Sequence, residues 1–142
     1  MLKSSSSSSK KTYLDYPHLP EVRDYADYVR GLGALLVVLF GSVARGEFRA
    51  ESDADVLVLV AKPMEWKQVY QRTHGIVQPI VKTVEEYLAQ IQEGEPFFVE
   101  MIEDGIPLYD SDGWHRRLIA EVESAKAKWG LVRTMFGWQW TK

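Results

Sequence analysis

Hydrophobic residues follow two patterns along the chain, continuous runs and helical spacing. Residues 34–40 and 56–61 are continuous apolar runs rich in Leu and Val, which predict strands covered on both faces. Before the first run, apolar residues recur with helical spacing at Val22, Tyr25, Ala26 and Val29. This spacing predicts an amphipathic helix that ends near Gly31 and Gly33.

The second half of the chain continues the alternation. Residues 63–74 have a weaker helical pattern, and residues 76–82 are a third strand candidate interrupted by Pro79, which favours a sheet edge or a bulge. Thr83 and Glu86 have capping-box spacing ahead of a helical pattern. Pro96 can open a further helix that ends at Gly105, followed by a short strand over 106–109. Strands that alternate with helices predict an α/β domain.

The two ends of the chain differ from the middle. Residues 1–11 are rich in Ser and Lys and are expected to form a flexible tail, because they have little apolar area to bury. The domain proper is expected over 12–112. Residues 113–142 predict a long helix, with an apolar stripe from Trp114 to Trp129, and an aromatic tail. Two interpretations of that tail remain open, a docking face for a partner and a segment that folds back over the sheet.

Composition narrows the function. The 142 residues suffice for one domain, and the absence of cysteine excludes disulfides, thiolate zinc sites and cysteine nucleophiles. A formal net charge of −3 argues against nucleic acid as a partner. No apolar run is long enough for a membrane span or a signal peptide, so a cytoplasmic location without membrane association is expected.

The most informative stretch is LFGSVARGEFRAESDADVLVLV, residues 39–60. If Asp53 and Asp55 begin a strand, both carboxylates lie on one face. At about 4 Å they repel by roughly 1 kcal/mol in water and about 4 kcal/mol near a protein surface. Protonation of one carboxylate or a bound divalent cation would offset that repulsion, and a ligand set made only of oxygen favours Mg²⁺ or Mn²⁺.

The segment that precedes the aspartates can hold phosphate. Gly41 lets backbone come close to a ligand, and Ser42 adds a hydroxyl next to amides expected to lead into a helix. Arg45 can add charge-assisted contacts, or it can pair with a neighbouring glutamate. One loop would then hold a polyphosphate while the next strand holds the metal.

These residues carry a family resemblance. The pattern G-S-x-x-x-R-G followed by S-D-x-D and an apolar strand resembles the minimal nucleotidyltransferases of the DNA polymerase beta superfamily. The resemblance implies an α/β (α+β) fold with a small mixed sheet flanked by helices. It implies nucleotide binding by Gly41, Ser42, Arg45 and Ser52, and catalysis and metal binding by Asp53 and Asp55. The implied reaction transfers a nucleoside monophosphate from a nucleoside triphosphate, ATP first, to a protein or small-molecule acceptor.

One position departs from the family pattern. The third carboxylate of the family is expected on the next strand, where this chain has Gln78. Three outcomes are open: an enzyme that works without it, a carboxylate supplied from elsewhere, or a catalytically degenerate module that binds nucleotide or a partner. Four nearby glutamates are alternative sources, namely Glu85, Glu86, Glu95 and Glu100. The resemblance also implies a helical partner of HEPN type, toward which some members act as antitoxins; self-association through the aromatic tail is the other option.

Overall fold

The structure, a computed structural model, describes residues 10–142. Most of the segment expected to be a tail therefore lies outside the described residues. Lys11, which was assigned to that tail, donates a hydrogen bond from its ammonium group to the carbonyl of Phe48 and lies over the Phe48 ring, 4.4 Å from its centroid. A short 3₁₀ helix, η2 (Tyr13–Asp15), follows.

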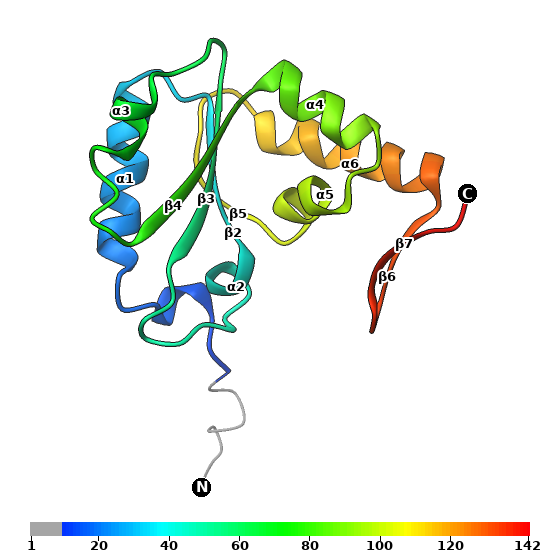
Figure 1. The fold of residues 1–142 in the computed structure, drawn as a ribbon, viewed down its shortest axis with the longest axis horizontal. Coiled ribbons are helices and arrows are strands. Elements are labelled where there is room, and N and C mark those ends of the chain that lie inside the picture. The colour runs from blue at the N-terminus through cyan, green and yellow to red at the C-terminus, as the bar shows by residue number, and fades with distance from the viewer. Residues whose placement is uncertain (1–9) are drawn as a thin grey trace, which may run out of the picture.

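A four-stranded mixed sheet organises the fold (Figure 1). Its order is β4 (Val77–Thr83), β3 (Ala54–Val60), β2 (Leu36–Phe40) and β5 (Ile106–Asp110). The β2 strand is antiparallel to both β3 and β5, whereas β3 and β4 are parallel. The two continuous apolar runs form the two central strands, as their pattern predicts, and the mixed sheet between helices confirms the expected fold class.

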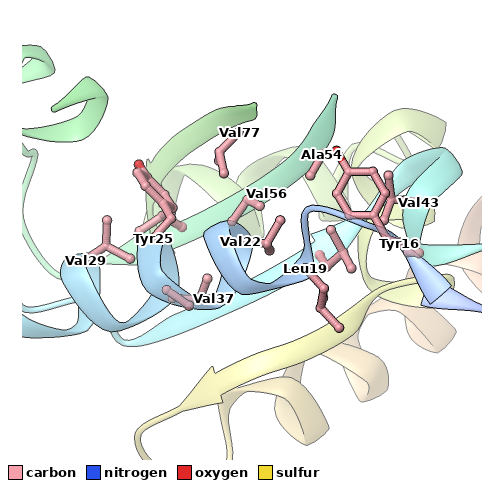
Figure 2. Packing of buried hydrophobic residues seen from close by; sticks show 14 of the residues in the cluster. Tyr16, Leu19, Val22, Tyr25, Val29, Val37, Val43, Ala54, Val56 and Val77 are labelled. Atoms are coloured by element: carbon pink, nitrogen blue, oxygen red, sulfur yellow. The ribbon is translucent and has the colours of Figure 1, made fainter. Parts of the chain in front are cut away.

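Helices cover both faces of this sheet (Figure 1). On one face, α1 (Leu19–Gly31) buries Val22, Tyr25 and Val29 against strand residues such as Val37 and Val56 (Figure 2). The predicted helix over 63–74 is wrong in extent, because only α3 (Trp66–Tyr70) is helical. It buries a single residue, Val69, so apolar packing supports only a short helix.

The other face is covered by α4 (Val84–Gln92), α5 (Pro96–Glu103) and α6 (Trp114–Trp129). Leu118 and Val122 of α6 belong to the same buried cluster as Leu57 and Leu59 of β3. The capping box that opens α4 is present, with the Thr83 hydroxyl accepting from the Glu86 amide at 3.1 Å. No helix within residues 10–142 has the length and apolar character needed to cross a bilayer.

Two further features of the fold are the edge strand β4 and a hairpin at the C-terminus. Pro79 lies in β4, which is an edge strand, as its missing amide hydrogen requires. The aromatic tail is a hairpin of β6 (Leu131–Thr134) and β7 (Gly137–Trp140), which sequence analysis did not predict. The hairpin contacts the helices that cover the sheet, since the indole N–H of Trp140 donates to the carbonyl of Gly94, in the loop between α4 and α5, at 2.8 Å.

Candidate active site

The first part of the site is the junction between β2 and α2 (Gly41–Ala44). Gly41 has a φ of +77°, and a Cβ atom added there would lie 2.6 Å from Oδ2 of Asp55. Only glycine fits both conditions without strain. Val43 and Ala44 are buried and hold the turn against the sheet. Ser42 stays half-buried beside them, and its carbonyl accepts from the Glu47 amide at 2.9 Å.

The loop between α2 and β3 is fixed by the N-terminal segment. Phe48 is buried and packs edge-on against Tyr16, with ring centroids 5.3 Å apart. The Tyr16 hydroxyl donates to the carbonyl of Ser52, and the Ser52 Oγ accepts from the Arg49 amide at 2.9 Å. No local pattern in the sequence identifies Tyr16, because the Ser52 carbonyl that it contacts lies 36 residues away. Its role depends on tertiary contacts alone.

The two aspartates lie where β3 begins. Asp53 is exposed immediately before the strand, and Asp55 is half-buried as its second residue, on the same face as Leu57. Burial raises the pKa of the Asp55 carboxyl, the negative charge of Asp53 raises it further, and Arg45 opposes both. Within residues 10–142, no basic side chain forms an ion pair with either carboxylate.

Gln78 occupies the neighbouring place on β4. It is paired with Asp55 in the parallel register, and its amide Nε2 donates to Oδ2 of Asp53 over a long 3.5 Å. The position matches the place where sequence analysis expects a third carboxylate. A carboxamide there can orient Asp53, but it cannot act as a base at neutral pH.

Arg45 is held at the border of the site by carboxylates. Its Nε lies 2.9 Å from Glu47, and its Nη1 lies 3.8 Å from Asp104 after the end of α5. The hydrogen bond to Glu47 is the main cause of its raised pKa, with further contributions from Glu100 and Asp104. The structure therefore has the pairing with a glutamate that the sequence left as one of two options.

Two of the alternative glutamates have structural partners. Glu86 accepts from the Thr83 amide at 2.9 Å and closes the capping box of α4. Glu100 lies 3.7 Å from the Arg133 guanidinium. Among the described residues, no group of three Asp, Glu or His side chains could hold a metal ion by itself. The site thus offers two protein carboxylates.

A family match covers the segment that carries these residues. The sequence profile described as the nucleotidyltransferase domain matches residues 22–109, more than half of the chain. The chain belongs to this nucleotidyltransferase family. The match spans α1 to β5 and so includes the whole sheet and the Asp53–Asp55 segment. No curated protein gives a significant match in sequence.

Three solved structures are similar to this chain, and the one with a TM-score above 0.5 shares its fold. A toxin-antitoxin structure with AMP-PNP is 15% identical, covers 78% of this chain and 86% of its own, and has a TM-score of 0.52. A mutant of the toxin-antitoxin MntA-HpeT is 15% identical, covers 78% and 87%, and has a TM-score of 0.45. A protein from Sulfolobus solfataricus, provisionally assigned as a nucleotidyltransferase, is 26% identical, covers 61% and 81%, and has a TM-score of 0.43.

The ligand chemistry of this nucleotidyltransferase fits a divalent cation. Two adjacent carboxylates without a cationic partner repel each other, and a bound ion removes that repulsion while both remain ionised. Mg²⁺ in proteins is commonly bound by one or two carboxylates together with substrate phosphates and water. Nucleotidyltransferases as a class use divalent metals, and the two aspartates here can supply the protein part of such a site.

Two cavities lie away from the carboxylates. One, of about 510 Å³, is lined by residues such as Val60 and Lys62 at the opposite end of β3. The other, of about 450 Å³, lies between α4 and α6 and is lined by Leu88 and Trp114. Asp53 is instead exposed at the start of β3, where a ligand can approach from solvent.

Proposed function

We propose that this nucleotidyltransferase moves a nucleoside monophosphate from a nucleoside triphosphate, with ATP as the first donor to test, to a protein or small-molecule acceptor. An acceptor hydroxyl oxygen bonds to the α-phosphorus, and the bond from that phosphorus to the bridging oxygen of the β-phosphate breaks. The hydroxyl proton passes to solvent or to a nearby base, and pyrophosphate leaves. In-line displacement of this kind depends on position and charge stabilisation more than on covalent chemistry by the protein.

One observation carries the proposal. Asp53 and Asp55 are close enough for the charge of one to raise the pKa of the other, and no basic residue within 10–142 pairs with them. Asp55 lies directly against Gly41, whose missing side chain leaves room for the Asp55 carboxylate. This arrangement supports a metal bound by the carboxylates next to phosphates bound by the Gly41–Ser42 turn.

Each residue of the proposed site has its own role. Asp53 and Asp55 hold Mg²⁺ or Mn²⁺, which would supply charge neutralisation at the transferring phosphate. Gly41 and Ser42 offer backbone amides and a hydroxyl to the phosphates. Ser52 accepts from the Arg49 amide and keeps its own hydroxyl proton to donate. Arg45 contributes positive charge at the border of the site, where its charge partly opposes the rise in the pKa of Asp55.

The donor and the partner are proposed from the comparisons and from one surface. The fold neighbour with TM-score 0.52 was solved with AMP-PNP, a close analogue of ATP, and as a toxin-antitoxin complex. We take residues 12–112 as the nucleotidyltransferase domain and residues 113–142 as a segment that packs on this domain through α6 and meets a partner, of HEPN type by family resemblance, through its hairpin. The tip of the hairpin supports this, because Met135 and Phe136 are 90% and 84% exposed.

Calorimetric titration tests the function. Wild-type protein should bind ATP only in the presence of Mg²⁺ or Mn²⁺, and the Asp53→Asn, Asp55→Asn double variant should lose that binding. The matched control is Asp112→Asn, an exposed aspartate that pairs with Arg117 at 3.2 Å in the segment before α6. Equal binding by the wild type and the double variant would show that the aspartates are not the metal site.

The second candidate is a module that binds nucleotide or a partner without turnover. It is favoured by one observation, the neutral Gln78 that contacts Asp53 in place of a third carboxylate. This candidate predicts metal-dependent nucleotide binding without release of pyrophosphate, or a partner complex that survives the double substitution. Detection of pyrophosphate in the presence of the acceptor would eliminate it.

A further inference from the structure

Helix α5 presents one aromatic ring to solvent although most of the helix is buried. Val99, Met101 and Ile102 have at most 1% of their surface exposed, whereas Phe97, in the first turn, is 51% exposed. Its ring meets Phe98 edge-on, with centroids 5.3 Å apart. This contact uses one edge of Phe97 and leaves much of the ring in water.

Sheet register places this ring beside the aspartates. Phe40, the last residue of β2, is directly opposite Asp55 in the antiparallel pairing with β3. Side chains of such a pair lie on the same face, with Cβ atoms about 4.5–5.5 Å apart. The Phe97 ring packs edge-on against Phe40, with centroids 6.1 Å apart and planes at 80°. One buried ring therefore separates Phe97 from the Asp55 carboxylate.

A second contact joins α5 to the turn that begins at Gly41. The guanidinium Nη1 of Arg45, the residue that follows α2, lies 3.8 Å from Oδ2 of Asp104, the residue that follows α5. Both ends of α5 are therefore held near this turn, the first through Phe97 and Phe40 and the second through Asp104.

We propose that Phe97 is the surface on which the nucleobase of the bound nucleoside triphosphate stacks. This assignment rests on the proposed function, in which the phosphates lie on Gly41 and Ser42. Gly41 directly follows Phe40, so a nucleotide with its phosphates on that turn has the exposed ring of Phe97 beside it. Trp66, at 70% exposure, belongs to α3, which packs with α1 on the opposite face of the sheet, and Phe136 lies at the tip of the hairpin.

The chemistry of the ring determines what it selects. A phenyl ring has no hydrogen-bond donor or acceptor, so it recognises the flat face of a base and not its edge. Stacking on an aromatic side chain is tolerant of base identity, since every base has a π-face. Phe97 should therefore favour purines over pyrimidines through their larger area, without separating adenine from guanine.

Titration with nucleotides and with a ligand that lacks a base tests this assignment. The ligands are ATP, GTP, CTP, UTP and inorganic tripolyphosphate, each with Mg²⁺, and the proteins are wild type, Phe97→Ala, Phe97→Leu, Phe97→Trp and Trp66→Ala. Phe97→Ala should weaken ATP and GTP binding about tenfold or more and CTP and UTP binding less, from the usual contribution of one stacked base. Tripolyphosphate binding should change by less than about twofold.

The other variants separate stacking from packing. Phe97→Leu keeps an apolar side chain against Phe40 but removes the ring, so it should behave like Phe97→Ala. Phe97→Trp keeps an aromatic ring at this position, so it should bind ATP as tightly as the wild type does. Trp66→Ala should leave every affinity unchanged, and thermal melting of each variant shows whether the fold is retained.

Several results would overturn the assignment. Unchanged nucleotide affinity in Phe97→Ala, in a protein whose metal-dependent binding is still lost with Asp53→Asn and Asp55→Asn, would refute the stacking role and leave the proposed function intact. An equal loss of tripolyphosphate affinity would show that Phe97 only supports the phosphate turn through Phe40. A slower transfer at unchanged nucleotide affinity would put the ring on the acceptor side. If the wild type binds neither ATP nor tripolyphosphate, the proposed function fails and this inference with it.

Discussion

Charged side chains gather in two regions of this nucleotidyltransferase, and their charges are balanced differently. At the start of β3, Asp53 and Asp55 stand together without an ion-pair partner within residues 10–142. At the hairpin, Arg133 lies 3.3 Å from Glu103 and 3.2 Å from Asp104. The two carboxylates at the start of β3 repel each other, whereas the carboxylates near the hairpin are neutralised by Arg133.

This difference separates a binding site from a structural contact. The ion pairs of Arg133 hold the hairpin against the end of α5. At the end of α6, just before the hairpin, the indole of Trp129 donates a hydrogen bond to the carbonyl of Gln92 at 2.8 Å. The two carboxylates at the start of β3 repel each other, and in the proposed function a bound cation offsets that repulsion. Perturbation of the first region should change ligand binding, and perturbation of the second should change stability.

The largest effect is expected from Gly41→Ala. The substitution forces a side chain into the left-handed region at a φ of +77° and against the Asp55 carboxylate. We expect a loss of about 1–2 kcal/mol in the free energy of unfolding from the backbone alone. Metal-dependent nucleotide binding should be abolished as well, because Asp55 must move.

Gly75→Ala is the matched control for that substitution. Gly75 has a φ of +67° with open space around the added Cβ. The Gly75→Ala variant should show the same loss in the free energy of unfolding, measured by chemical denaturation, without a change in calorimetric binding of nucleotide. Normal binding by Gly41→Ala would place the metal elsewhere.

The next effect concerns Gln78→Asp, which adds a third carboxylate beside Asp53. Without metal, the added charge should lower stability by about 1 kcal/mol, because like charges near a surface repel. With Mg²⁺, the affinity for the ion should rise by about tenfold. Melting temperatures with EDTA and with Mg²⁺ measure both changes.

Gln139→Asp, an exposed position on β7, serves as its control and should not respond to Mg²⁺. A Gln78→Asp variant whose stability is the same with and without the ion would contradict the metal site. An accompanying rise in pyrophosphate release would show that the third carboxylate limits turnover in the wild type.

A smaller effect is expected from Arg133→Ala in the compensated region. The variant leaves Glu100, Glu103 and Asp104 without this guanidinium and should lose about 1 kcal/mol of stability, less at high salt. Arg117→Ala removes one exposed pair with Asp112 and should stay within about 0.5 kcal/mol of wild type. Both variants should retain nucleotide binding, and its loss in Arg133→Ala would mean that the two regions are coupled through Asp104.

The smallest effect is the pH dependence of Asp55. A raised carboxyl pKa means that the folded protein binds the proton more tightly than the unfolded chain, so ionisation of Asp55 destabilises the fold. That cost develops as pH rises from the ordinary aspartate pKa of about 3.9 to the raised pKa, and it is relieved as pH falls again. In EDTA, Asp55→Asn should therefore melt a few degrees above wild type at neutral pH.

The gap between Asp55→Asn and wild type should close in acid, where both side chains are neutral. Addition of Mg²⁺ and ATP at neutral pH should reverse the order, because only the wild type gains a ligand. A gap that does not vary with pH would show that the ionisation of Asp55 is not its cause.

Local patterns in the sequence predicted much of the fold and of the candidate site. Two apolar runs predicted the central strands, Pro79 predicted an edge strand, and Thr83 with Glu86 predicted the start of α4. Such signals depend on alternation, capping and missing donors, which act over a few residues. The motif also predicted that Asp53 and Asp55 would be near neighbours, and the charge of Asp53, which raises the pKa of Asp55, agrees.

Contacts between distant segments could not be predicted from those patterns. The sequence indicated an aromatic tail, but only the structure shows that it pairs as a hairpin whose Trp140 bonds to the carbonyl of Gly94 in the α4–α5 loop. It indicated that Arg45 had two possible partners, and only the fold brought Asp104 to within 3.8 Å of it. It gave no sign that Phe97 would lie near Asp55, since 42 positions separate them in the printed sequence.

The sequence by itself therefore determined the central elements of this protein, the family to which it belongs and the residues available for chemistry. The tertiary structure decided which of those residues share a surface. Gly41 and Asp55 meet because β2 and β3 pair in one antiparallel register, in which Phe40 faces Asp55. A shift of that register by one residue would turn every side chain to the other face of the sheet, so the register, which is set by packing on both faces, positions the candidate site.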